Sequence, residues 1–143
     1  MKTVDFQHLL LQAAVVAMAA DGEVAEEEKQ ELARIVNSTA YFLGSDHTTT
    51  LPVLLADSSN FGNEAIRKLT RLIQEGDLKP RQEEVLLEVL LRIVEADSIV
   101  NSAEREMLRV LRPCFQQTDT ALLTRFPRLL NYMLPSSDDS LHS

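Results

Sequence analysis

Six carboxylates crowd one short stretch of the chain, and carboxylates at this density can hold a cation or act as acids and bases. They lie between residues 21 and 31 with Lys29 as the single basic residue among them. Oxygen donors of this kind suit a hard ion such as Ca²⁺ or Mg²⁺ better than zinc or copper. The spacing is not that of an EF-hand loop, because Glu26 falls where glycine belongs and Leu32 where the bidentate acid belongs. A site here would therefore be shallow, partly hydrated and weak.

Part of this stretch recurs 76 residues further along the chain. The repeated unit reads Asp-x-x-Val-x-x-x-Glu: Asp21, Val24 and Glu28 in the first copy, and Asp97, Val100 and Glu104 in the second. Apolar positions around the unit match at the same offset, for example Leu32 with Leu108. Each copy predicts a buried helix, a tight corner and an amphipathic helix, and two such units can pack about a pseudo-dyad. The candidate cation ligands are Asp21, Glu23, Glu28, Asp97 and Glu104.

Helix capping offers a second explanation for the repeated glutamates. Glu104 follows Asn101 by three residues, which is the spacing of a capping box. Ala25, at the corresponding position of the first copy, has no side-chain acceptor, so reciprocal capping explains Glu28 less fully. The aspartates are harder to explain, because a carboxylate at a helix C-terminus costs about 0.3 to 1 kcal/mol. A turn amide, a basic side chain or a cation should offset that cost.

Charge and composition narrow the class of protein. The 143 residues carry 14 Lys and Arg against 22 Asp and Glu, a net charge of -8, which disfavours binding to nucleic acid. Cys114 is the single cysteine, so it can form neither an internal disulfide nor a thiolate zinc site. The longest apolar stretch, residues 9–20, is too short to span a membrane, and no secretory signal is recognised. We therefore expect a cytoplasmic protein without a membrane span.

Low Gly and Pro content and apolar residues at three- and four-residue steps predict an all-α protein. We expect a compact bundle of about six to seven helices. The first helix and the helix that follows Pro80 are apolar nearly all round and should lie at the centre. We expect Asn63 to cap one helix, Gly76 to end it, and Pro127 to break another. The predicted helices cover residues 5–20, 25–36, 63–76, 80–94, 102–115 and 119–134.

The remaining segments are polar. Residues 37–63 predict a long connection with one short helix near Pro52, and His47 should be a surface loop residue within it. Residues 1–134 are expected to form a single domain, followed by a flexible tail over residues 135–143.

The duplicated motif resembles the paired signature of TerB-like (tellurite-resistance B) domains, which are also seen at the front of DjlA-type co-chaperones. The resemblance covers about residues 5–134. It rests on the strings AADGEVAEEE, residues 19–28, and EADSIVNSAE, residues 95–104. It implies about seven helices with internal pseudo-symmetry, no catalytic activity, and an acidic patch that interacts with divalent cations. Ser98 departs from the pattern because the first copy has Gly22 at that position.

The sequence thus favours a non-enzymatic binding or scaffold domain in a stress response, with protein partners or a second copy of itself as ligand. Two alternatives stay open: an oligomerisation module without metal, and a carboxylate-based hydrolase. A di-iron enzyme is disfavoured because none of the three histidines belongs to a Glu-x-x-His pair. Cys114 lies in an apolar helical phase, which predicts a buried, inert thiol. A basic region is expected to be a solvated face: Arg67, Lys68, Arg71, Lys79 and Arg81.

Overall fold

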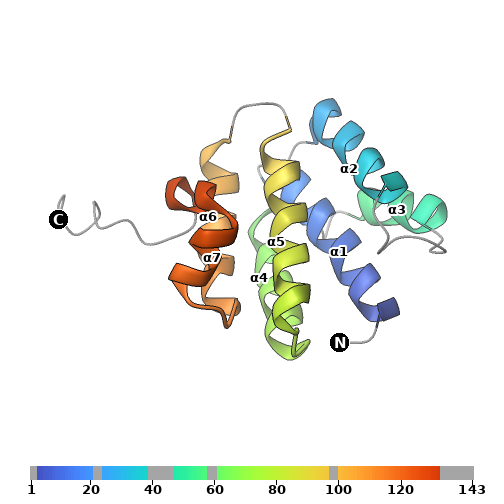
Figure 1. Ribbon diagram of the computed structural model, residues 1–143. Coiled ribbons are helices and arrows are strands. Elements are labelled where there is room, and N and C mark those ends of the chain that lie inside the picture. Colours follow the sequence, from blue (N-terminus) through green and yellow to red (C-terminus); the bar gives the residue numbers. More distant parts are fainter. Residues whose placement is uncertain (1–2, 21–23, 39–46, 58–60, 97–99, 133–143) are drawn as a thin grey trace.

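The computed structural model describes residues 3–20, 24–38, 47–57, 61–96 and 100–132 (Figure 1). This part of the chain contains seven α-helices, two short 3-10 helices and no strand, so the predicted all-α class is confirmed. The elements are α1 (Thr3–Met18), α2 (Glu26–Ser38), α3 (His47–Ala56), α4 (Gly62–Glu75), α5 (Pro80–Val94), α6 (Ser102–Leu111), η3 (Arg112–Cys114), α7 (Asp119–Arg125) and η4 (Pro127–Asn131).

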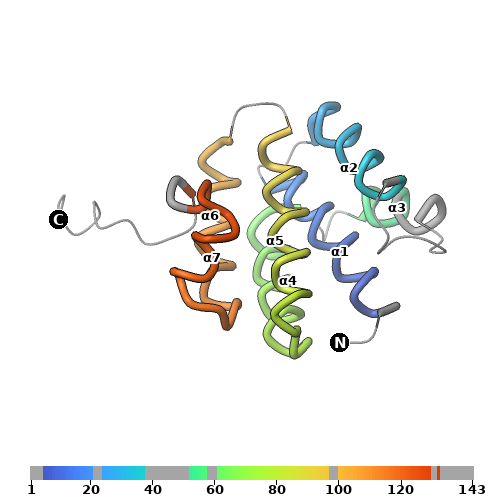
Figure 2. The backbone as a smooth tube through the Cα atoms, in the orientation of Figure 1, coloured from blue at the N-terminus to red at the C-terminus, as the bar shows by residue number. Residues whose placement is uncertain are grey.

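Two helices that lie far apart in the sequence form the centre of the bundle. α1 packs against α5 along its length and also contacts α4, while α2 packs against α5. In Figure 1, α2 and α3 lie on one side of this centre, and α6 and α7 lie on the other. The chain trace shows that α1 and α5 both run toward the top of the view (Figure 2). The C-terminal ends of α1 and α5 therefore lie toward the same end of the bundle (Figure 2).

The central position of α1 and α5 follows from their composition. An amphipathic helix buries one stripe, whereas a helix that is apolar all round must be covered on every side. In α1 the residues from Ala13 to Met18 are at most 1% exposed. In α5 Pro80 occupies the first turn, where its missing N–H costs nothing, and every residue of the run from Val85 to Leu87 is buried. Both predictions of a buried central helix are confirmed.

The helix predicted to begin at Asn63 shows how helix ends depend on more than cap propensity. α4 is amphipathic as expected, but its N-cap is Phe61, which makes no side-chain capping hydrogen bond. Asn63 lies inside the first turn, so the predicted cap is wrong. Gly76 ends the helix as predicted, but it keeps a right-handed φ of -75°, and Asp77 takes the left-handed φ of 50°. Aspartate tolerates this conformation better than most residues, since its short polar side chain can bond locally.

Three further helices of the described chain contain a proline or end near one. The short helix of the long connection, α3, begins at His47 and contains Pro52 in its interior, so His47 belongs to a helix and not to a loop. α6 ends at Leu111 instead of residue 115, and Pro113 follows within the 3-10 helix η3. The break at Pro127 is confirmed, because α7 ends at Arg125 and η4 begins at Pro127. The predicted tail over residues 135–143 lies outside the described residues.

Helix bounds repeat at the offset found in the sequence. α1 ends at Met18 and α5 at Val94, while α2 begins at Glu26 and α6 at Ser102; both pairs differ by 76 residues. Superposition of the two units by a pseudo-two-fold operation stays a prediction. No helix in the described ranges is long and apolar enough to cross a membrane.

Candidate functional site

The candidate cation ligands divide between residues that the structure describes and residues that it does not. Asp21, Glu23 and Asp97 lie outside the described residues. Glu28 and Glu104 are described, and each lies in the first turn of the helix that leaves its corner. From here on, the first corner means the first turn of α2 with the residue before it, and the second corner means the first turn of α6 with the residue before it.

The second corner carries a complete capping box. The Asn101 side chain accepts a hydrogen bond from the backbone N–H of Glu104 at 2.8 Å. The Glu104 carboxylate accepts one from the backbone N–H of Asn101 at 3.0 Å. Two backbone donors that the helix itself cannot satisfy are thereby paired, as the sequence predicted.

The first corner keeps half of this arrangement. The Glu28 carboxylate accepts a hydrogen bond from the backbone N–H of Ala25 at 3.2 Å, which corresponds to the bond between Glu104 and Asn101. The reciprocal bond cannot form, since Ala25 has no side-chain acceptor. Glu28 is therefore engaged in capping even though a full box is impossible there.

Both glutamates are buried, Glu28 to 4% exposure and Glu104 to 3%. Burial of a carboxylate is expensive without hydrogen bonds or a positive charge, which explains why each one bonds a backbone amide. Nowhere in the described ranges do three or more His, Cys, Asp or Glu side chains gather as a metal site would require. A cation at either corner would thus need the corner aspartates or Glu23 in addition to these glutamates.

The exposed face of the first corner is acidic. Glu26 and Glu27 are exposed, and neither forms an ion pair with any residue that the structure describes. Glu31, one turn further on, is neutralised by two bases: it lies 2.8 Å from Arg34 and 2.8 Å from Arg92 of α5. Burial raises the pKa of Glu31, but the hydrogen bonds and charges of both arginines outweigh that effect and lower it overall. The surplus negative charge therefore lies at the very start of α2.

The second corner is tied instead to the C-terminal part of the chain. Glu95, at the end of α5, lies 3.3 Å from Arg128 and accepts a hydrogen bond from the Tyr132 hydroxyl at 3.0 Å. The guanidinium of Arg105 stacks over the Tyr132 ring, 5.5 Å from its centroid. Burial and the Glu95 carboxylate raise the pKa of Tyr132. The Glu95 carboxylate beside this corner is thus paired within the molecule.

Two features of the structure escaped sequence reasoning. The first is a groove between α5 and the α7–η4 segment, where Arg92, Arg125 and Arg128 come together from separate elements. The second is Glu83, which is 2% exposed and accepts a hydrogen bond from the backbone N–H of Gln116 at 2.9 Å. Its other oxygen has no partner among the described residues. The burial of Glu83 could have been predicted, because the helical periodicity places it on the same side of α5 as buried apolar residues. The groove could not, because it depends on contacts between distant segments that no local sequence pattern reveals.

Cys114 is buried as predicted, with 7% of its surface exposed. Burial raises the pKa of its thiol, so the reactive thiolate is disfavoured. Its sulfur lies 3.9 Å from the Thr70 carbonyl oxygen. The prediction of a buried thiol is confirmed.

Together these observations define an all-helical domain with two buried central helices and a glutamate-capped corner after each. A family model described as tellurite resistance protein TerB matches residues 8–124, and the chain belongs to this TerB family. No curated protein and no solved structure matches the chain.

Proposed function

We propose that this chain is a non-enzymatic binding domain in a cytoplasmic stress response, and that its first corner binds a divalent cation such as Ca²⁺ or Mg²⁺. The corner end of the bundle then serves as the docking surface for a protein partner. Family membership supports a role of the tellurite-resistance type. The observation that carries the proposal is the unbalanced acidic face at the start of α2.

The negative charge of this face makes the first corner a better cation site than the second. Glu26 and Glu27 are exposed without ion pairs in the described part of the chain, and Asp21 and Glu23 precede them directly in the sequence. At the second corner the sequence has Ile99 where the first has Glu23, and Asn101 engages the Glu104 carboxylate and amide. A hard cation gains affinity with each anionic oxygen offered to it. The first corner therefore supplies the stronger site.

A cation would also relieve the repulsion among these carboxylates. Like charges close together raise each other's free energy, and a bound divalent ion removes that penalty. The exposed acidic side chains of α2 that the cation does not engage stay available to a basic partner surface.

The test is a titration with CaCl₂ and, separately, MgCl₂, followed by amide NMR signals of α2 and α6. We expect saturable shifts in α2 at lower cation concentration than in α6. Asp21→Asn should weaken Ca²⁺ binding by about tenfold, because one of a small set of anionic ligands is lost. Asp97→Asn, the matched variant at the second corner, should leave the α2 response unchanged.

Equal loss in the two variants would contradict the asymmetry between the corners. The absence of any shift with the parent protein would leave capping as the whole role of Glu28. A mass that rises with protein concentration in the absence of cation would favour the oligomerisation module instead. Hydrolysis of an ester substrate that Glu28→Gln abolishes, with the fold intact, would favour an enzyme.

A further inference from the structure

We propose that the groove between α5 and the α7–η4 segment binds a phosphate monoester. Its phosphoryl group would be held by the guanidinium groups of Arg92, Arg125 and Arg128. The organic part would lie against the exposed Pro127. This site does not depend on the function proposed for the corners, and it shares with the second corner only Arg128, which pairs with Glu95.

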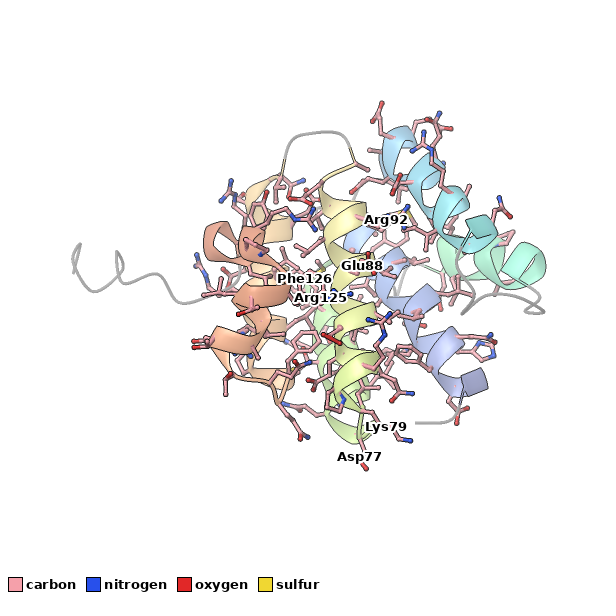
Figure 3. The ribbon with its side chains drawn as sticks, viewed as in Figure 1. Asp77, Lys79, Glu88, Arg92, Arg125 and Phe126 are labelled. Atoms are coloured by element: carbon pink, nitrogen blue, oxygen red, sulfur yellow. The ribbon has the colours of Figure 1, made fainter. Side chains whose placement is uncertain are left out.

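The groove is large enough for a small organic ligand. Its volume is about 570 Å³, within the range of about 300–1,000 Å³ that is typical of ligand sites. In Figure 3, Glu88 and Arg92 lie along α5, while Arg125 and Phe126 reach toward them from the α7 side. The lining residues are Glu88, Arg92, Arg125, Phe126, Pro127 and Arg128.

The three arginines retain donors for a ligand. Each guanidinium carries five N–H donors. Arg92 uses its Nε to donate to Glu31 at 2.8 Å. Arg125 and Arg128 approach Glu84 and Glu95 only to 3.8 Å and 3.3 Å, and neither donates a hydrogen bond to any described residue. Most of the fork-shaped donor surface is thus available to an incoming oxyanion.

The existing ion pairs are of a kind that exchanges readily. The side chains of Arg125 and Arg128 are 55% and 50% exposed, and ion pairs in such solvated positions contribute little. A phosphate offers three oxygens to planar guanidinium groups and can be bound by two forks at once. At Arg125 and Arg128, exchange of a solvated carboxylate partner for a bidentate phosphate therefore favours the ligand.

The rest of the lining argues for an organic phosphate over a bare ion. Pro127 is exposed and supplies an apolar surface next to the arginines, while Phe126 lines the groove with 7% of its surface exposed. Glu88 is exposed in the groove and can accept hydrogen bonds from ligand hydroxyls. Glu88 also repels a free anion that approaches its side of the groove, which would limit binding to ligands that carry a neutral, hydroxyl-bearing part there.

The test uses AMP as a phosphate monoester, adenosine as the same molecule without phosphate, and inorganic phosphate as the anion alone. Binding is followed by amide NMR of the full chain at constant ionic strength. We expect AMP to shift the amide signals of residues 88, 92, 125, 126 and 128. Adenosine should bind at least about tenfold more weakly, and inorganic phosphate should also bind more weakly than AMP.

Variants separate the groove from general surface charge. Arg125→Gln and Arg128→Gln should each weaken AMP binding by about three- to tenfold, because each removes one charged fork. Arg67→Gln is the matched control: Arg67 is 71% exposed, pairs with Glu64 at 3.1 Å and lies on α4. Its affinity for AMP should equal that of the parent protein.

Three results would overturn the proposal. Adenosine that binds as tightly as AMP would remove the role of the arginines, and inorganic phosphate that binds as tightly as AMP would remove the role of the apolar surface. An equal loss of affinity in Arg67→Gln would show that AMP responds to overall charge and not to the groove.

Discussion

The two corners share a backbone bond but differ in what surrounds it. At both corners a buried glutamate accepts a hydrogen bond from the N–H group three residues earlier, at 3.2 Å in the first and 3.0 Å in the second. The second corner adds the reciprocal bond, in which the Asn101 side chain accepts from the backbone N–H of Glu104. The nearby Glu95 also pairs with Arg128 and Tyr132. The first corner lacks the reciprocal bond and presents exposed acidic side chains.

This comparison distinguishes the capping role of the repeated glutamate, which both corners share, from any role that only one corner has. The bond to the N-cap amide is common to both units, so it accounts for the glutamate in each. The two units differ in features found at one corner only: the acidic face of α2 and the Tyr132 contacts beside α6.

The largest expected effect tests whether the units contribute equally to the core. Leu32 and Leu108 occupy matching positions and are 1% and 0% exposed. Leu32→Ala and Leu108→Ala should each lower the free energy of unfolding by about 2–5 kcal/mol, through lost burial and the cavity left behind. Urea denaturation measures both. If the loss at one leucine is less than half the loss at the other, the two positions do not contribute equally to the core.

A smaller change in the free energy of unfolding is expected when the N-cap residue of each corner is replaced by that of the other. Asn101→Ala converts the second corner to the arrangement of the first and should lower the free energy of unfolding by about 1 kcal/mol. Ala25→Asn should raise it by a similar or smaller amount, since it supplies the missing acceptor. Urea denaturation of both variants and of their combination measures the effect. A stabilising Asn101→Ala, or a destabilising Ala25→Asn, would show that the corners need different residues for reasons other than capping.

Acid pH should weaken the link between the units at Glu31. The pKa of Glu31 is lower in the folded state than in the unfolded state. Its charged form therefore stabilises the fold fully at pH values above the unfolded-state pKa, and this stabilisation is lost as the pH falls through the folded-state pKa. Glu31→Gln should cost about 1 kcal/mol or less at pH 7, and the difference from the parent should shrink below about pH 4. Denaturation at several pH values measures this. The control is Glu64→Gln, because Glu64 is 82% exposed and pairs with Arg67 of the same helix. This variant should lower the free energy of unfolding at pH 7 by less than Glu31→Gln does. An equal loss in the two variants would contradict the role of burial.

The smallest effect concerns the titration of Tyr132. Burial and Glu95 raise its pKa, so Glu95→Gln should lower that pKa toward the ordinary value of about 10. Tyrosinate absorbance in a Tyr41→Phe background reports Tyr132 alone, because the chain has two tyrosines. An unchanged titration curve would show that the second corner is not coupled to the C-terminal segment through Glu95.

Features that depend on neighbours along the chain could be predicted. The all-round apolar character of α1 and α5 and the three-residue spacing of Asn101 and Glu104 are local patterns with a direct structural consequence. The N-cap at Phe61 and the left-handed Asp77 could not be predicted, because tertiary packing sets where α4 begins and how the chain leaves it.

Features made by residues distant in the chain were also missed. Arg92 comes from α5 and Arg125 and Arg128 from the segment around Pro127, so their shared groove depends on how those elements pack. Of the candidate cation ligands, the structure describes Glu28 and Glu104 only, and the cation site itself stays a prediction.

The pairing of α1 with α5 also sets an order of events during synthesis. α1 ends at Met18 but the helix that covers it ends at Val94, so 76 further residues must be made first. At ribosomal speeds of about 5–20 residues per second, the wait is about 4–15 s. Throughout this interval an apolar helix has no native cover on the side that α5 will occupy. Neither repeated unit can therefore complete its fold on the ribosome before the other has emerged.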